Sequence, residues 1–206
     1  MMTINSFRGS EKGASAAEFA MVLPIFLLFL LGTIDAGRYI WNINEVEKSL
    51  QTGARWAIAT DMVCSGLQDW SFATDDPAAV AQGTPVPRNV FNGVDYPGGD
   101  AANCVCPPGA SCNFPMTANT DAYEALVARM DDIYPDLAAE NVSVEYDYSG
   151  LGYSGDPHAP DVSPIVTVRA RGLGFRPIFL GTIFDAGLPD LSYSLTMEDG
   201  QGSFAN

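Results

Sequence analysis

The sequence predicts an α+β protein in which one long N-terminal transmembrane helix precedes a small antiparallel-sheet domain with a disulfide-stapled loop region. Three observations lead to this prediction. An uncharged apolar run occupies residues 19–34. All four cysteines follow that run, in a stretch rich in glycine, proline and aspartate. Segments of alternating apolar residues, which are typical of half-buried strands, lie in the last third of the chain.

The charge of the chain is strongly one-sided. Its 206 residues include 25 acidic and 10 basic side chains, a formal net charge of -15, and most of the acidic side chains follow residue 60. Nucleic-acid affinity comes mostly from lysine and arginine side chains that displace counterions from phosphates. The acidic balance therefore argues against a nucleic-acid partner. The length allows one ordinary domain with an appendage.

The N-terminal apolar run is long enough to cross a membrane. Residues 19–34 carry no charge, and the small residues 14–17 extend the helical stretch to about 20 residues, the length that spans a bilayer core. In the leader before this stretch, Arg8 and Lys12 outweigh Glu11, which predicts a cytoplasmic leader and export of the remaining chain. We therefore expect a single-pass membrane protein.

Three interpretations of this segment differ in where a protease cuts. A cleaved secretory signal needs a small-x-small site after the apolar run, and the tract after Leu31 contains no good site of that kind. A plain signal anchor is not cut. In a prepilin-like leader the cut comes before the apolar run, between Gly13 and Ala14, and Glu18 becomes the fifth residue of the mature chain. The third interpretation accounts for more of the residues.

Glu18 interrupts otherwise apolar sequence. A carboxylate within a bilayer costs about 2.5 to 3.5 kcal/mol on insertion scales, so such a residue usually has a partner. Cleavage before Ala14 creates a positively charged amino terminus, and the Glu18 of a neighbouring molecule can pair with it inside a helical bundle. The alternative is that Glu18 lies at the interfacial edge of the membrane without a partner.

Residues 13–38, GASAAEFAMVLPIFLLFLLGTIDAGR, resemble the opening of TadE-like proteins, the minor pilins or pseudopilins of tight-adherence systems. The Glu-Phe pair, the Val-Leu-Pro tract and the late acidic-x-Gly-Arg element are specific in combination. The resemblance is close over residues 13 to about 60 and looser in the C-terminal strands. It implies processing by an aspartic prepilin peptidase, residence in the bacterial inner membrane, and a role in building a type IV-like pilus or a related secretion system.

The resemblance also implies roles for individual residues. Gly13 corresponds to the residue before the cut, Ala14 to the new N-terminus, and Glu18 with Phe19 to the docking pair. The expected partners are the prepilin peptidase, other pilins and pseudopilins, the inner-membrane assembly platform and the membrane itself. Pro24 removes one hydrogen bond from the helix, and it is either a built-in bend used in assembly or a harmless membrane proline.

The helix is expected to continue beyond the membrane to about residue 59. Apolar residues recur at three- and four-residue spacing with charged residues between them, which is typical of an amphipathic helix packed on a globular domain. These positions are Ile40, Ile43, Val46, Leu50, Ala54 and Ala57. The expected organisation is a leader at residues 1–13, a helix at 14–60 and an α+β periplasmic domain at 61–206.

Residues 61–118 form a long loop-dominated region in which we expect disulfides to take the place of a core. Cys64, Cys104, Cys106 and Cys112 follow an export segment and lack the spacing of paired zinc knuckles, which favours disulfides over free thiols or a metal site. Four thiols allow three pairings. Cys104 and Cys106 are too close in sequence to reach the preferred Cα separation easily, so we expect bonds Cys64–Cys104 and Cys106–Cys112.

One helix and three strands are expected in the remainder. The helix covers residues 121–134, with Asp121 and Glu124 in capping-box spacing and Pro135 at its end. Residues 175–189 are unusually apolar, and we expect a short helix there that either covers the sheet or offers a patch to a partner pilin or the membrane surface. Strands are expected at about residues 142–148, 165–170 and 191–197.

No constellation of residues supports catalysis, a cofactor or a metal. His158 is the single histidine and lies in a proline-flanked tract that is poorly suited to orient a general base. The pairs Asp75-Asp76 and Asp131-Asp132 lack the alternating ligand pattern of a calcium loop. A membrane-tethered hydrolase needs a catalytic cluster, which is missing here. The rival to a pilin-like protein is a permanently anchored periplasmic adaptor or binding protein that does not polymerise.

Overall fold

The computed structural model describes residues 11–206 except 111, 158, 182–185, 199 and 201–206, and it describes side chains from residue 15 onward. Two compact units are present. The first comprises the chain up to Asn42 together with Gly174–Ala186, and the second comprises Ile43–Leu173 and the chain from Gly187 on. His158, considered above as a general base, is one of the residues outside this description.

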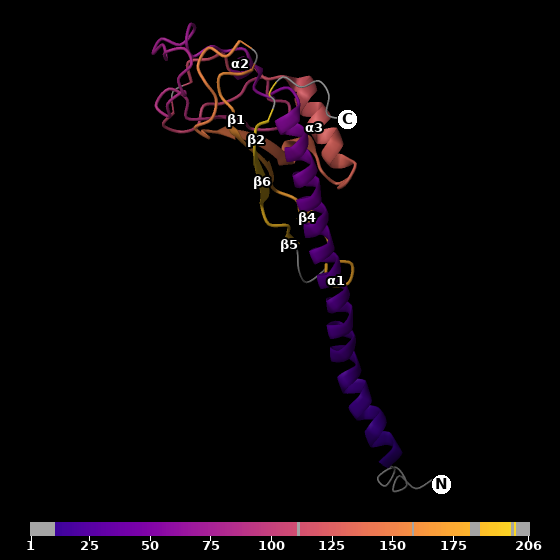
Figure 1. Ribbon diagram of the computed structural model, residues 1–206. Coiled ribbons are helices and arrows are strands. Elements are labelled where there is room, and N and C mark those ends of the chain that lie inside the picture. The colour runs from indigo at the N-terminus through magenta and orange to yellow at the C-terminus, as the bar shows by residue number, and fades with distance from the viewer. Residues whose placement is uncertain (1–10, 111, 158, 182–185, 199, 201–206) are drawn as a thin grey trace, which may run out of the picture. The chain divides into compact units, whose positions relative to one another are not determined.

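The first unit is built on the N-terminal part of helix α1, which spans Glu11–Ala59 and is drawn in indigo and purple in Figure 1. The helix begins before Ala14 and continues through Pro24. Among the described helices, α1 is long and apolar enough to cross a membrane, and none of its most apolar stretch is buried within the protein. The large exposed side chains of this stretch are Phe19, Met21, Val22, Ile25, Phe26, Leu27, Leu28, Phe29 and Leu30.

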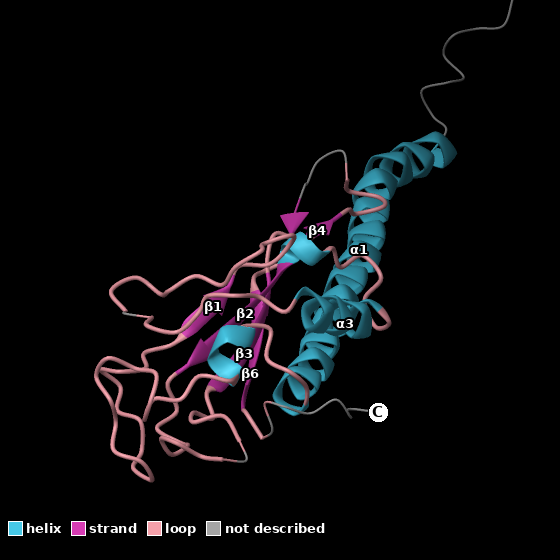
Figure 2. Ribbon diagram, turned by 90° about the horizontal axis from the view of Figure 1, so that it is seen from above, coloured by secondary structure: helices cyan, strands magenta, loops and turns pink. Residues whose placement is uncertain are grey.

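In the second unit, α1 packs against helix α3, which spans Thr120–Asp131 and lies beside it in Figure 2. The Ser49 hydroxyl donates to the Met130 carbonyl oxygen at 3.0 Å. A Cβ atom at Gly53 would lie 2.6 Å from the Met130 sulfur, so the glycine permits this close approach. The predicted packing face is confirmed for Val46, Leu50, Ala54 and Ala57. It is wrong for Ile40, which is 59% exposed and belongs to the first unit.

The centre of the second unit is a four-stranded antiparallel sheet in the order β1-β2-β3-β6. The three predicted strands are confirmed, because β2 spans Val142–Asp147, β3 Ile165–Ala170 and β6 Leu191–Thr196. Alternating valines place one face of the sheet in the core, and Val144 lies opposite Val168 in the register. The edge strand β1, Val94–Tyr96, lies in the region expected to be loop.

The expectation that residues 61–118 lack a core is wrong. Phe72, Phe91 and Phe114 are buried, and their rings form two successive contacts with centroids 6.1 Å apart. Aromatic contacts of this kind add to the free energy gained from area burial alone. The short helix α2, Ser65–Gln68, also lies in this region and buries Leu67. The other buried apolar side chains of the region include Met62, Val63, Val86, Val90, Val94 and Tyr96.

Two disulfides join this region, and they have the pairing expected from the sequence. Cys64 is bonded to Cys104, and Cys106 is bonded to Cys112. The Tyr146 hydroxyl accepts a hydrogen bond at 2.8 Å from the Val63 amide, next to the first bond. Complete burial raises the pKa of the Tyr146 hydroxyl, so the side chain stays neutral in this position. The disulfides thus supplement a packed aromatic core.

Helix α3 starts and ends at other residues than the sequence predicted. Asn119 is its N-cap and accepts a hydrogen bond from the Ala122 amide at 3.1 Å, so the expected capping box of Asp121 and Glu124 is wrong. The helix ends at Asp131, before the predicted stop at Pro135. A short 3₁₀ turn, Ala139–Asn141, then leads into β2.

The apolar connection after β3 differs from the expected helix. Its described part contains two short strands, β4 (Gly174–Phe175) and β5 (Ala186–Gly187), which pair with each other. Residues 174–181, called the strap below, belong to the first unit together with the N-terminal part of α1. The predicted short helix is therefore wrong for the described residues, and residues 182–185 lie outside them.

The two disulfides close loops of different length, so we expect different contributions to stability. Their sequence separations are 40 residues for Cys64–Cys104 and 6 residues for Cys106–Cys112. In the chain-entropy account, Cys64→Ser/Cys104→Ser lowers the free energy of unfolding by about 4 kcal/mol and Cys106→Ser/Cys112→Ser by about 2 kcal/mol. Urea unfolding of the detergent-solubilised protein, followed by tryptophan fluorescence, measures both losses. Equal losses would contradict the loop-length argument.

Candidate functional site

The predicted assembly residues lie along the exposed part of α1. Phe19 is 64% exposed, and Glu18 and Pro24 are exposed on the same helix. Within the side chains that the structure describes, Glu18 has no ion-pair partner. Gly13 and Ala14 lie in α1, but their side chains are outside the described set. A single chain therefore leaves both the apolar surface and the Glu18 carboxylate available to a surrounding membrane or protein.

Asp35, directly after the apolar run, fastens the strap to α1 within the first unit. Its carboxylate accepts three hydrogen bonds of 2.9 Å from successive backbone amides, those of Ile178, Phe179 and Leu180. The Asp35 residue is only 3% exposed. Hydrogen bonds to an ionised acceptor contribute roughly twice as much as those between neutral groups. The three amides thus replace the water that the carboxylate would otherwise bind.

The residues around Asp35 extend this contact along one face of the helix. The Arg38 guanidinium lies 3.8 Å from the Asp35 carboxylate and donates to the Arg176 carbonyl oxygen at 3.5 Å. The Tyr39 ring meets the Phe175 ring edge to face, with centroids 5.2 Å apart. Residues three and four apart share a helix face, so the acidic-x-Gly-Arg element presents both charged side chains to the strap.

An apolar hollow of about 330 Å³ lies between this helix face and the strap. Gly32 forms part of its wall, and a Cβ atom there would lie 3.4 Å from a Leu180 methyl group. Two large strap side chains point away from the contact, since Ile178 is 63% and Phe179 44% exposed. The hollow is lined by Gly32, Asp35, Ala36, Tyr39, Ile40, Phe175, Pro177, Leu180 and Ala186.

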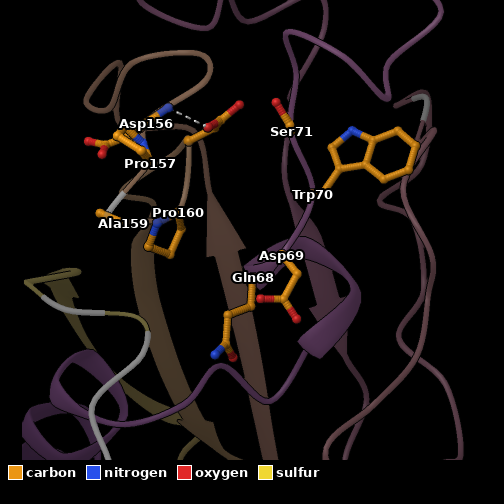
Figure 3. Close-up of a pocket in the computed structure, with 9 residues that line it drawn as sticks. Gln68, Asp69, Trp70, Ser71, Asp156, Pro157, Ala159 and Pro160 are labelled. Carbon is orange, nitrogen blue, oxygen red and sulfur yellow. Dashed lines mark hydrogen bonds between the residues drawn. The ribbon is translucent and has the colours of Figure 1, made fainter.

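A second, polar hollow of about 170 Å³ lies in the second unit, between the loop that follows α2 and the loop before β3. Figure 3 shows Trp70 and Ser71 on one side and Asp156, Pro157 and Pro160 on the other. The loops are held together by Asp161, whose carboxylate accepts hydrogen bonds from the Phe72 amide at 2.6 Å and the Asp156 amide at 3.1 Å. Both carboxylate oxygens of Asp161 therefore serve a structural role.

The acidic pairs singled out in the sequence have structural partners or lie on the surface. Asp75 accepts from the Ser71 amide at 3.2 Å, and Asp76 accepts from the Ala78 amide at 2.7 Å and from Asn113 at 3.3 Å. Such side-chain bonds to nearby backbone are typical of turns. Among the described residues, no group of three or more His, Cys, Asp or Glu side chains is arranged to hold a metal ion.

Comparison with protein families finds a match for the N-terminal segment. The family model described as TadE-like protein matches residues 13–55. This segment is TadE-like. The match confirms the resemblance over residues 13–55, which contain Gly13, Glu18, Pro24 and Asp35 but neither the strap nor the cysteines. No curated protein and no solved structure matches the chain.

Sequence reasoning recognised the acidic-x-Gly-Arg element of the TadE-like segment but assigned Asp35 no role. The partner of Asp35 is the strap, and Ile178 follows Asp35 by 143 residues in the sequence. One signal was present in the sequence, because Asp35 follows directly after the uncharged run, where a carboxylate needs either water or donors. The apolar composition of residues 175–189 was a second signal, but nothing in the sequence indicated that this tract contacts Asp35.

Removal of the Asp35 carboxylate should release the backbone of the strap. Each hydrogen bond to a charged acceptor contributes about 1.5 to 3 kcal/mol, so Asp35→Ala should speed exchange of the Ile178, Phe179 and Leu180 amides by roughly ten- to a hundredfold. Asp35→Asn should have an intermediate effect, because one amide oxygen can still accept. Hydrogen–deuterium exchange with mass spectrometry measures this change.

Glu18→Gln is the matched control, since it removes an exposed carboxylate from the same helix without touching the strap. Its exchange at residues 178–180 should equal that of the unchanged protein. Unaltered exchange in Asp35→Ala would show that these amides have other acceptors.

Proposed function

We propose that the chain is a minor pilin or pseudopilin that takes part in assembly of a tight-adherence, type IV-like pilus or a related secretion system. The single observation that supports this proposal most strongly is the TadE-like match over residues 13–55. It covers both the proposed cleavage position at Gly13 and the carboxylate of Glu18 within apolar sequence. Its helical context agrees, because both lie in α1.

The proposed mechanism begins with removal of the leader. A prepilin peptidase cuts between Gly13 and Ala14, and the new amino terminus carries a positive charge. In a bundle of such helices, the Glu18 carboxylate of one molecule pairs with the amino terminus of a neighbour, which offsets the cost of placing either charge in apolar surroundings. Phe19 packs beside this pair. The exposed apolar side chains of α1 support the mechanism, since they need a lipid or protein partner.

The proposed location is the bacterial inner membrane, with the second unit in the periplasm. The candidate membrane-spanning helix near the N-terminus supports a single-pass protein, and the excess of Arg8 and Lys12 in the leader supports its cytoplasmic placement. Both disulfides belong to the second unit and fit an oxidising compartment. The partners are the prepilin peptidase, other pilins, pseudopilins and the assembly platform. In this proposal the chain is a structural component and not an enzyme.

Processing separates this proposal from a permanently anchored adaptor. Mass spectrometry of protein extracted from membranes of cells that contain the peptidase should find Ala14 at the N-terminus. Gly13→Leu should abolish cleavage, because a bulky side chain occupies the position before the cut. Gly37→Ala is a suitable control, since a Cβ atom there meets nothing within 4 Å. An intact leader in the unchanged protein would favour the adaptor.

Substitutions of Glu18 test whether its charge acts in assembly. Placing an unpaired carboxylate in the bilayer costs about 2.5 to 3.5 kcal/mol. If pairing of Glu18 recovers half of this cost, its loss would lower incorporation into the pilus roughly tenfold. Glu18→Ala and Glu18→Gln should therefore insert and be cleaved but fail to assemble, whereas Glu18→Asp should keep partial function. Co-purification with other pilins and pilus counts provide the measurement.

Glu47→Ala is the matched control for this series, because Glu47 is exposed on the same helix beyond the apolar run. It should assemble like the unchanged protein. Normal incorporation of a correctly cleaved Glu18→Ala protein would show that Glu18 only marks the membrane edge.

A further inference from the structure

If α1 spans a membrane, the attachment of the strap to Asp35 determines the depth of the strap in the bilayer. The apolar part of α1 ends at Ile34, and the 21 residues 14–34 rise about 32 Å at about 1.5 Å per residue. The hydrocarbon core of a bilayer is about 30 Å thick. If α1 crosses the membrane, Asp35 lies at the boundary between acyl chains and headgroups. The amides of residues 178–180 are bonded to Asp35, so the strap lies at that same depth.

Irregular backbone tolerates such a position only when its polar groups have partners, because an unsatisfied amide costs several kcal/mol in lipid. Three successive amides of the strap donate to Asp35, and Pro177 has no amide hydrogen to satisfy. The Arg176 carbonyl oxygen accepts from Arg38. Three amides and one carbonyl of the strap are thus bonded to α1, whereas its large side chains Ile178 and Phe179 are exposed.

The surface around these side chains matches a membrane interface in composition. Ile40 and Trp41 are exposed on the adjoining turn of α1, and aromatic residues such as tryptophan and tyrosine are enriched at the headgroup level. Arg176 belongs to the strap and Arg38 lies beside it on α1, in a chain with a net charge of -15. Cationic side chains beside an apolar surface are attracted to anionic phospholipids.

We propose that the strap is an interfacial membrane anchor that inserts Ile178 and Phe179 into the outer leaflet, with the guanidinium groups of Arg38 and Arg176 at anionic phospholipid headgroups. Asp35 positions the strap by holding its amides. This inference rests on the membrane insertion of α1 that is part of the proposed function. It adds a second point of contact with the bilayer, in which Arg176, Ile178 and Phe179 lie far along the chain from the TadE-like segment and Arg38 lies within it.

Photo-crosslinking of the full chain in lipid nanodiscs tests the anchor. Phe179→p-benzoylphenylalanine in discs that contain phosphatidylglycerol should yield phospholipid adducts, identified by mass spectrometry, at about ten times the level of Tyr153→p-benzoylphenylalanine. Tyr153 is the matched reference, since it is an aromatic residue of the second unit that is 58% exposed. Adducts of Phe179 with a second copy of the chain, or lipid adducts no higher than the reference, would overturn the proposal.

Three further variants separate the anchor from the insertion of α1 and test the arginines. Phe26→p-benzoylphenylalanine reports on the apolar run. Lipid adducts at residue 26 without adducts at 179 would refute the anchor alone, whereas their absence at both would refute membrane insertion as well. Arg176→Gln should lower the adducts at residue 179 roughly fivefold in anionic discs, and Arg88→Gln, an exposed arginine of the second unit, should not. Equal yields in these two arginine variants would contradict the headgroup contact.

Discussion

The uncovered apolar surface of α1 is the constraint on which the rest of the first unit depends. Side chains such as Phe26 and Phe29 have no protein cover within the chain, and exposed apolar area of this extent is unfavourable in water. A lipid bilayer or a bundle of like helices removes that cost. Polar groups next to this surface must then be satisfied locally, as Asp35 and the strap amides satisfy one another. Glu18 has no such partner among the described side chains.

The second unit must fold despite repulsion between its acidic side chains. Its surface is strongly acidic, and like charges on one small domain oppose compaction. Three features offset this repulsion: the face of α1 beyond Ile43, the aromatic contacts that involve Phe91, and two disulfides in one loop region. Glu145 also pairs with Arg169 at 2.6 Å and with Arg171 at 3.3 Å across the sheet. Arg169 and Arg171 thus lie where the acidic side chains Asp95, Glu145 and Asp147 come close together.

The elements that a local pattern specifies were predictable from the sequence. The long helix follows from its apolar run and periodicity, and the strands β2, β3 and β6 follow from alternation of apolar residues. Strand β1 was missed, because three residues between glycine-rich turns carry no visible period. The N-cap is Asn119 rather than Asp121. Both residue types can cap a helix, and the sequence alone does not determine at which of the two the helix begins. The contact between Asp35 and the strap joins distant segments, and one sequence contains no signal for such a pairing.

The separation of 143 residues between Asp35 and Ile178 also orders events during biosynthesis. A ribosome adds about 5 to 20 residues per second, so the strap is made roughly 7 to 30 s after Asp35. During this interval the Asp35 carboxylate has no strap amides to bind. If α1 spans the membrane as proposed, the nascent helix integrates with a hydrated Asp35, which is feasible at the lipid–water boundary and costly in the hydrocarbon. The timing of synthesis thus limits how deeply this residue can be placed, independently of the finished fold.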